Sequence, residues 1–340
     1  KKYYFYAMKR LITLFAIFLL HLQLFAQNYK SDILGGRFEQ TTIVMPKDYE
    51  GDVVCTVVRL KANKPANKAV LYIHGFNDYF FQSEMAQQFV RNGYNFYAVD
   101  LRKYGRSLLP HQKPCNARKI REYYADIDTA ISIILNEKNN FILLCGHSTG
   151  GLIASLYAND GKKRKAINAI WLNSPFFDMN LNVVLKRLGL PLVVGIGRMN
   201  PNIAIPISSS TFYGESLHID YRGEWNYNLK WKSLKSPKMN SGWIRAIYHA
   251  QHKLRKGLKI NCPVLVMHSD KSLSGSKWSN YFRRADIVLN TADIKKYAAK
   301  LGANVTVQSI EGGKHDLILS EKDAREKVYN NLFRWLKNLI

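Results

Sequence analysis

Short apolar runs alternate with amphipathic segments along most of this chain. The apolar runs predict buried strands, at residues 41–45, 52–60, 69–73, 94–99, 141–145, 166–172, 263–268 and 304–310. Apolar residues at helical spacing predict helices between them, at residues 84–92, 119–136, 292–301 and 321–339. Strands that alternate with helices are typical of a mostly parallel sheet with helices on both faces, so the pattern predicts an α/β fold.

The alternation stops between the strands predicted at 166–172 and 263–268. Residues 181–257 instead carry many aromatic side chains, namely Tyr213, Tyr221, Trp225, Tyr227, Trp231 and Trp243. Because ligands of parallel sheets bind at the carboxyl ends of the strands, we expect this insertion to form a cap over that edge. Its aromatic residues would build an apolar substrate cleft or the cap's own core. The expected organisation is a core of residues 27–180 and 258–340 with a cap at 181–257.

The first residues have the pattern of a targeting segment. Met8-Lys9-Arg10 is positively charged, residues 11–20 are apolar, and Ala26 is a small residue at a suitable cleavage position. This order predicts a secretory signal peptide at 1–26 and a secreted or periplasmic protein. The alternative is an uncleaved N-terminal anchor, although the apolar run is shorter than the ~20 residues that a membrane span needs.

The composition is strongly basic, with a formal net charge of +25 over 340 residues. No basic block is interleaved with aromatic residues as in nucleic-acid-binding modules, so we expect no nucleic-acid partner. The basic run at 162–165 is interpreted as a solvated turn between a helix and a strand. The charge still predicts weak attraction to an anionic membrane surface. The four cysteines form no C-x-x-C pair, so the sequence gives no indication of a metal site.

The strand predicted at 141–145 leads directly into the most informative motif. Residues 146–150 read Gly-His-Ser-Thr-Gly, which is G-x-S-x-G, and a helix is expected to follow. Strand, motif and helix in this order form a nucleophile elbow, a tight turn that exposes the serine side chain at the end of the sheet. The turn requires small flanking residues, and Gly146 and Gly150 supply them. We therefore expect Ser148 to be a nucleophile.

A nucleophilic serine needs a base, which is usually a histidine. His315 lies in a loop after the strand predicted at 304–310 and before the last helix. A loop in that place can reach over Ser148, so we expect His315 to be the base. His268 ends the strand predicted at 263–268 and is interpreted as structural or pocket-lining.

The chain offers several carboxylates that could orient this histidine. Asp270 directly follows the strand predicted at 263–268, whereas Asp286 follows a loop rich in Ser, Lys and aromatic residues. In the usual arrangement a strand and a loop lead to an Asp that is followed by two apolar residues. Asp286, followed by Ile287 and Val288, fits this pattern better than Asp270, which is followed by Lys271 and Ser272. We favour Asp286, keep Asp270 as the alternative, and place Asp178 third.

An acyl-transfer site also needs two backbone N–H groups that stabilise an oxyanion. One comes from the residue after the nucleophile, here Thr149. The other comes from the loop that follows the strand predicted at 69–73, which begins His74-Gly75-Phe76. Phe76 is the expected second donor.

These motifs together resemble the α/β-hydrolase superfamily, and more narrowly its serine aminopeptidase S33-type group, which includes monoacylglycerol lipase and lysophospholipase-like enzymes. The matching segments are 74–76, 100–107, 146–151 and 312–316, which read HGF, DLRKYGRS, GHSTGG and GGKHD. The resemblance covers about residues 40–340 and implies the α/β-hydrolase fold with an inserted cap. Two departures are Lys103-Tyr104, where Gly-His is common, and the long loop before Asp286.

The resemblance implies a serine hydrolase that cleaves carboxylic esters of apolar acids, such as monoacylglycerols or lysophospholipids, through an acyl-enzyme. Its partner would be a small-molecule ester or lipid, and no metal or organic cofactor is implied. One alternative is an S33-type aminopeptidase, which would need an acidic cluster in the cap, for which Glu215, Asp220 and Glu224 are available. The second alternative is a non-catalytic binding protein, against which the intact Ser, His and Asp set argues.

Overall fold

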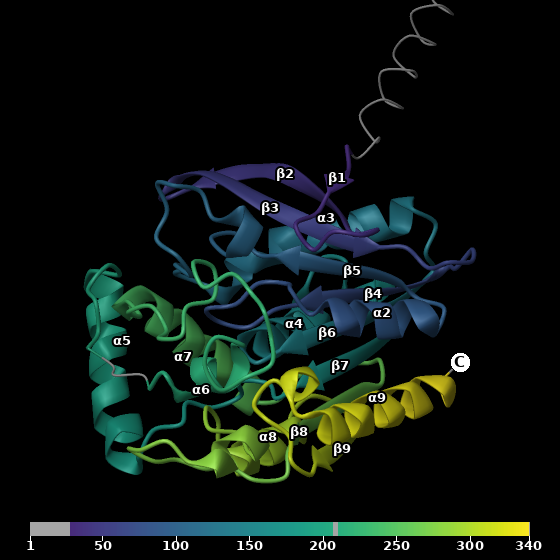
Figure 1. The fold of residues 1–340 in the computed structure, drawn as a ribbon. Helices are drawn as coiled ribbons and strands as arrows, with labels where there is room; N and C mark the ends of the chain where they lie inside the picture. Colours follow the sequence, from purple (N-terminus) through teal and green to yellow (C-terminus); the bar gives the residue numbers. More distant parts are fainter. Residues whose placement is uncertain (1–27, 207–209, 340) are drawn as a thin grey trace, which may run out of the picture.

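A single sheet forms the centre of the molecule (Figure 1). The computed structural model describes residues 28–206 and 210–339, so the signal peptide predicted at 1–26 lies outside the described residues. Within these residues the sheet has the strand order β1-β2-β3-β5-β4-β6-β7-β8-β9. Its strands are β1 (Lys30–Ser31), β2 (Glu39–Asp48), β3 (Gly51–Leu60), β4 (Lys68–Ile73), β5 (Asn95–Asp100), β6 (Phe141–His147), β7 (Ala169–Asn173), β8 (Val264–Ser269) and β9 (Val305–Ile310).

The sheet is antiparallel at one edge and parallel through the rest. Neighbours from β1 to β5 pair antiparallel, by way of β2 and β3. All neighbours from β5 through β4, β6, β7 and β8 to β9 are parallel. The prediction of a mostly parallel sheet is therefore confirmed. The carboxyl ends of the parallel strands share one edge of the sheet, where loops from distant parts of the chain meet.

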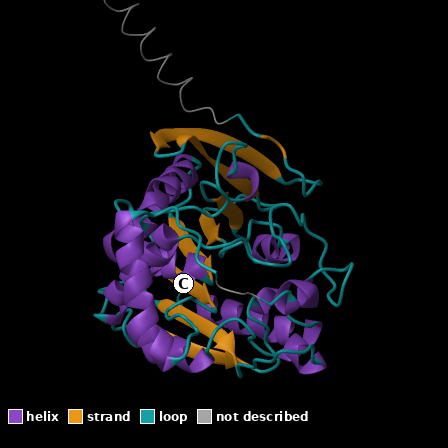
Figure 2. Ribbon diagram, turned by 90° about the vertical axis from the view of Figure 1, so that its left-hand side faces the viewer, coloured by secondary structure: helices purple, strands orange, loops and turns teal. Residues whose placement is uncertain are grey.

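Helices cover both faces of this sheet, as the view in Figure 2 shows. Strand side chains point alternately to the two faces: in β4, Leu71 and Ile73 join one core, and Val70 and Tyr72 join the other. The first core includes residues of α3 (Tyr124–Asn136), α4 (Thr149–Asp160), α7 (Ser241–Arg255) and α8 (Thr291–Ala298). The second includes residues of α2 (Ser83–Arg91) and α9 (Lys322–Lys337).

The predicted elements agree with the structure except at some boundaries. The helix predicted at 119–136 begins with the 3₁₀ turn Ile120–Tyr123, and α3 follows it. The strand predicted at 166–172 was placed too early, because Arg164–Ala166 forms a 3₁₀ turn and β7 begins at Ala169. The basic run at 162–165 lies in the connection between α4 and β7, and its side chains are largely exposed.

The connection between β7 and β8 holds the insertion noted in the sequence. It contains the π-helical turn Leu185–Gly189, α5 (Leu190–Met199), α6 (Phe212–Leu217) and α7. Of these, α7 packs into the first core through Trp243, Ile247 and Leu254, whereas α5 lies at the outer side of the molecule (Figure 1). Among residues 28–206 and 210–339, no helix is long and apolar enough to cross a membrane.

Candidate active site

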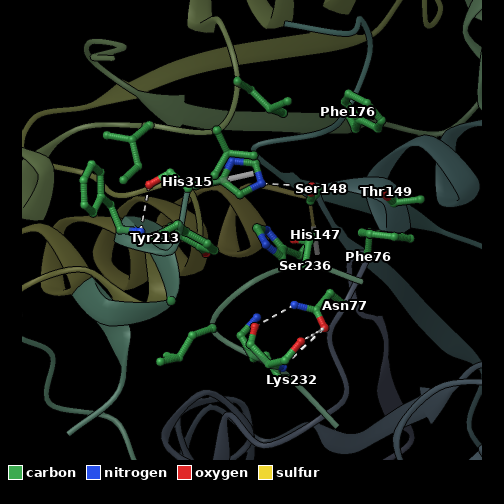
Figure 3. A pocket seen from close by; sticks show the side chains of 18 of the residues that line it. Phe76, Asn77, His147, Ser148, Thr149, Phe176, Tyr213, Lys232, Ser236 and His315 are labelled. Carbon is green, nitrogen blue, oxygen red and sulfur yellow. Dashed lines mark hydrogen bonds between the residues drawn. The ribbon is translucent and has the colours of Figure 1, made fainter. Parts of the chain in front are cut away.

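A cavity of about 400 Å³ lies where loops after the parallel strands meet the insertion (Figure 3). Its floor includes Ser148 and His315. The β7–β8 connection contributes many of its walls, and aromatic and aliphatic side chains predominate in the lining as a whole. Examples are Phe76, Phe176, Tyr213, Met239, Trp243 and Leu289. Such a lining suits a ligand with an apolar part.

Ser148 occupies the turn between β6 and α4 in a strained backbone conformation. Its φ is 51° and its ψ is −117°, which a residue with a side chain rarely adopts. The turn is closed by hydrogen bonds from the Ser148 N–H to Asn173 O at 3.0 Å and from the Phe176 N–H to Ser148 O at 2.9 Å. A Cβ on Gly146 would lie 2.5 Å from the carbonyl oxygen of Gly150, so only glycine fits there. This local geometry is that of a nucleophile elbow.

The structure brings Ser148, His315 and Asp286 into one hydrogen-bonded row. His315 Nε2 lies 2.9 Å from Ser148 Oγ, and His315 Nδ1 lies 2.8 Å from Asp286 Oδ2. Asp286 is fully buried, and Ser148 keeps 9% of its surface exposed to the cavity. Because a carboxylate only accepts, Nδ1 carries the ring proton and Nε2 is free to accept from the Ser148 hydroxyl. The row is thus arranged for proton transfer from Ser148 to His315.

Of the three carboxylates considered as the acid, Asp286 alone is held beside His315. Asp286 Oδ1 accepts from the N–H groups of Val288 and Leu289, both at 2.8 Å, which fixes the carboxylate in its loop. Asp270 is exposed and accepts from the Gly312 N–H at 3.0 Å. Asp178 pairs with Arg255 and Lys186 at 3.0 and 2.7 Å. Only Asp286 of the three contacts His315.

The two residues expected to supply oxyanion donors, Phe76 and Thr149, both line the cavity. Thr149 is the first residue of α4, and Phe76 lies in the loop after β4. Among the described residues, neither N–H donates a hydrogen bond, so both are available to a ligand oxygen. The Phe76 ring packs against Trp243 with centroids 4.4 Å apart.

A second buried histidine, His147, lies beside the row. Its ring lies 4.9 Å from that of His315, and its Nδ1 lies 3.2 Å from the carbonyl oxygen of Asn173. Burial lowers the pKa of His147, which keeps the ring uncharged at neutral pH despite the carboxylate of Asp316, 4.0 Å from Nε2. Because an uncharged His147 does not repel a positive charge, it does not oppose protonation of the neighbouring His315.

Lys103 shows how the chain accommodates a departure from the resembling family. Its φ of 68° is the left-handed region that favours glycine, the residue common at this position in the family. The fully buried ammonium pairs with Asp48 at 2.8 Å and Glu50 at 2.7 Å, and lies 4.1 Å from the Tyr49 ring centroid. The left-handed backbone costs about 1–2 kcal/mol, and the two carboxylates neutralise the buried ammonium group.

Sequence reasoning missed the polar part of the cavity wall. Lys232 is the only Lys or Arg among the described lining residues, and no Asp or Glu lines the cavity in that part of the chain. Ser233 and Asn77 also line it, and they bond to each other. No sequence motif marks Lys232 or Ser233, because their significance comes from packing against a loop about 150 residues earlier in the chain.

The three carboxylates considered for an amine-binding cluster do not line this cavity. Glu215 pairs with Arg222, and Glu224 pairs with Arg325 at 2.7 Å. The Asp220 side chain is 73% exposed. The insertion therefore places none of its three candidate carboxylates where a substrate amine would need one.

Comparison with solved structures finds the same fold in lipases and esterases. A soluble variant of monoglyceride lipase from Saccharomyces cerevisiae, in complex with a substrate analog, is 18% identical with a TM-score of 0.66, over 87% of this chain and 94% of that one. Paleococcus ferrophilus monoacylglycerol lipase is 17% identical with a TM-score of 0.61, over 84% and 99%. A thermostable carboxyl esterase from Bacillus coagulans, in complex with glycerol, is 13% identical with a TM-score of 0.61, over 88% and 98%.

Comparison by sequence places the chain more narrowly. No curated protein matches it. The family described as "Serine aminopeptidase, S33" matches residues 64–323, which include the elbow, the acid loop and the histidine loop. The resemblance seen in the motifs and the expected α/β-hydrolase fold are both confirmed. The chain belongs to the serine aminopeptidase S33 family of α/β-hydrolases.

Proposed function

We propose that this protein is a serine esterase that cleaves carboxylic esters of apolar acids, such as monoacylglycerols or lysophospholipids. The observation that carries the proposal is the row of Ser148, His315 and Asp286 at the floor of a largely apolar cavity. We further propose that residues 181–257 act as the cap, since this insertion supplies much of the cavity wall. The names of the similar solved structures, two lipases of monoacylglycerols and a carboxyl esterase, support the same substrate class.

The proposed acylation begins when Ser148 Oγ attacks the ester carbonyl carbon. The hydroxyl proton passes to His315 Nε2, and Asp286 stabilises the resulting imidazolium through Nδ1. The carbonyl oxygen becomes an oxyanion that accepts hydrogen bonds from the N–H groups of Phe76 and Thr149. Collapse of this intermediate breaks the bond to the alcohol, which leaves with the proton from His315 and gives an acyl-enzyme on Ser148.

Deacylation repeats these steps with water as the nucleophile. His315 takes a proton from the water, and the hydroxide attacks the acyl carbon. The second tetrahedral intermediate releases the carboxylic acid and returns the proton to Ser148. The aromatic walls exclude bulk water, which strengthens the hydrogen bonds to the oxyanion.

The electrostatics of the cavity favour an ester over a peptide with a free N-terminus. An aminopeptidase must bind a protonated amine, which needs a carboxylate within reach. The described lining residues include no Asp or Glu, so the lining offers no carboxylate to a substrate ammonium group. The one basic side chain among them, Lys232, is itself paired with the buried Asp78. The second alternative is a non-catalytic binding protein. Against it stands the hydrogen-bonded contact of His315 with both Ser148 and Asp286.

Hydrolysis of p-nitrophenyl esters from C2 to C12 tests the proposal, with aminoacyl anilides assayed in parallel. The chain lacking residues 1–26 should cleave the esters and not the anilides. Ser148→Ala should lower turnover by up to ~10⁶. Cleavage of anilides alone would instead identify an aminopeptidase. Failure to cleave either substrate, together with failure of a fluorophosphonate to label Ser148, would identify a binding protein.

We also propose export by the predicted signal peptide and weak binding to anionic lipid surfaces. The outer face of the α5 region carries an exposed apolar stripe spaced by three or four residues, formed by Val184, Leu188, Leu192, Ile196 and Met199. Exposed basic residues flank it, at Arg187 and Arg198. An apolar stripe flanked by positive charge on a protein of net charge +25 suits an anionic bilayer surface. Detection of the mature N-terminus at residue 27 in exported protein would test the first proposal.

A further inference from the structure

The loop after β4 is bonded at consecutive residues to the inserted segment 228–233. The residues concerned are Asn77, Asp78 and Tyr79. The Tyr79 hydroxyl accepts a hydrogen bond from the Asn228 N–H at 2.8 Å. Its ring also packs edge-on against Trp231, with centroids 5.1 Å apart. The segment 228–233 therefore lies along this loop and contacts its residues in turn.

Asn77 forms the part of this contact that lies nearest the site (Figure 3). Its side-chain amide donates to Ser233 O at 2.8 Å, and its Oδ1 accepts from the Ser233 N–H at 3.3 Å and hydroxyl at 3.1 Å. Its φ of 50° lies in the left-handed region, a conformation that surrounding contacts must maintain in a residue other than glycine. Ser233 thus holds the side chain of Asn77 through three hydrogen bonds.

Asp78 and Lys232 form a buried ion pair beside this contact. Asp78 Oδ1 lies 2.8 Å from Lys232 Nζ, and the residues are 1% and 5% exposed. Burial raises the pKa of Asp78, but the Lys232 ammonium and the nearby histidines, His147 and His74, together hold the pKa below its ordinary value. The other oxygen, Oδ2, accepts from the Gly75 N–H at 3.3 Å. The carboxylate therefore links Lys232 to the backbone on the other side of Phe76.

Phe76 is held from both sides as a result. Gly75 precedes it and is bonded through Asp78, whereas Asn77 follows it and is bonded through Ser233. This stretch runs against the nucleophile, because a Cβ on Gly75 would lie 3.2 Å from the Cβ of Ser148. An oxyanion donor acts only when its N–H points at the developing charge, and misplacement by 1 Å can cost ~10² in rate.

We propose that Lys232 and Ser233 are positioning residues that hold the Phe76 N–H at the oxyanion through Asp78 and Asn77. The insertion then contributes to the chemical step itself as well as forming the walls of the cavity. This inference rests on the proposed esterase function. It assigns Lys232 and Ser233 a part in the formation of the tetrahedral intermediate. This step is common to small and large ester substrates.

Two variants remove the contacts with little strain. Asn77→Gly deletes the amide and keeps a residue suited to positive φ. Lys232→Met combined with Asp78→Asn removes both charges together, which avoids leaving one buried charge unpaired. Lys230→Met is the matched control, because it removes a lysine from the same segment whose side chain is exposed and lies outside the cavity lining. Thermal unfolding and circular dichroism establish that each variant is folded.

The measurements are kcat and KM for p-nitrophenyl acetate and the rate at which a small fluorophosphonate labels Ser148. Labelling forms a P–O bond to Ser148 Oγ, expels fluoride and passes the serine proton to His315, so it also needs the oxyanion donors. We expect both Asn77→Gly and the double variant to lose ~10–10² in kcat and in labelling rate, with KM changed less than about twofold. Lys230→Met should match the wild type.

The outcomes separate this inference from the proposed function. Folded variants with wild-type kcat and labelling rate would overturn the inference, as would a change confined to KM, which would make Lys232 and Ser233 substrate contacts only. Wild-type protein that is labelled but cleaves no ester would refute the esterase proposal, and the labelling rates would still decide the positioning roles. Wild-type protein that is neither labelled nor active would refute both.

Discussion

Replacing Asp286 with asparagine changes one atom of the row formed by Ser148, His315 and Asp286, and it preserves the shape of a fully buried side chain. Two backbone donors fix how the new amide must lie. The N–H groups of Val288 and Leu289 both point at Oδ1 at 2.8 Å, so the amide oxygen must stay there. Reversal of the amide would place its NH₂ group against both donors. Each of the two backbone N–H groups would then lack an acceptor, at a cost of about 1–3 kcal/mol each.

The amide nitrogen of the variant therefore faces His315 Nδ1. Because this nitrogen donates, Nδ1 must accept, and the ring proton moves to Nε2, the atom that lies 2.9 Å from Ser148 Oγ. A protonated Nε2 cannot take the serine proton. The same change of tautomer in the triad of a serine protease lowers kcat by about 10⁴. We expect a similar loss here, equivalent to roughly 5–6 kcal/mol in activation free energy.

The assay is kcat for p-nitrophenyl butyrate at neutral pH, with Asp270→Asn as the matched control. Asp270 is exposed and bonded only to the backbone of the histidine loop, so its variant should stay within a few-fold of the wild type. Fluorophosphonate labelling of Ser148 should slow in Asp286→Asn to the same extent as kcat falls, and it should not slow in Asp270→Asn. Retention of more than a tenth of wild-type kcat by Asp286→Asn would refute the assignment. A large loss in Asp270→Asn would move it to the other carboxylate.

Three further predictions concern the elbow, a buried lysine and the outer face of α5. Gly150→Ala should abolish soluble folded protein or cost several kcal/mol in urea unfolding, because the new Cβ would collide with the carbonyl oxygens of Ile73 and His74 at the end of β4. Gly195→Ala is the control: its Cβ would meet nothing within 4 Å, so the variant should be neutral or more stable by up to ~1 kcal/mol. Burial lowers the pKa of Lys314 to about 8. At pH values between this pKa and the ordinary lysine pKa, the Lys314 side chain is therefore protonated in the unfolded chain and largely unprotonated in the folded one. The free energy of unfolding of wild type relative to Lys314→Met should therefore rise by roughly 2–3 kcal/mol from pH 7 to 10, and a flat difference would contradict the shift. Leu188→Ser with Leu192→Ser should reduce co-sedimentation with phosphatidylglycerol vesicles and leave kcat on soluble esters unchanged, whereas equal sedimentation of wild type and variant would remove the support for membrane binding by this face.

The sequence was most informative where structure depends on neighbouring residues. Strand and helix positions followed from local periodicity, which reports which face of each element is buried. The elbow was visible because its tight turn demands glycine at fixed distances from Ser148, and the structure shows why: a side chain at Gly146 or Gly150 would strike backbone atoms. Errors fell at element ends, such as the start of β7, where a 3₁₀ turn and a strand can use the same residues.

The acid loop shows where local reasoning ended. Pattern favoured Asp286 over Asp270 but could not decide between them, because the answer depends on how the long intervening loop runs. In the structure that loop pairs with itself, through the Asp286 N–H to Lys271 O at 3.0 Å, and this contact returns Asp286 to the end of β8. Lys103 is a similar case, since only the folded chain shows the two carboxylates that accompany its left-handed backbone.

The amino-acid sequence by itself determined the fold class, the nucleophile elbow and the expected catalytic residue types, because these depend on periodicity, glycine spacing and chain order. Tertiary structure alone decided which carboxylate meets His315, which charges line the cavity, and that residues 77 and 233, which are 156 positions apart, are hydrogen-bonded. The physical reason is that hydrogen bonds and ion pairs act over a few ångströms in space. The path of the chain that brings such distant residues together is set by the packing of the whole core, which no local pattern records.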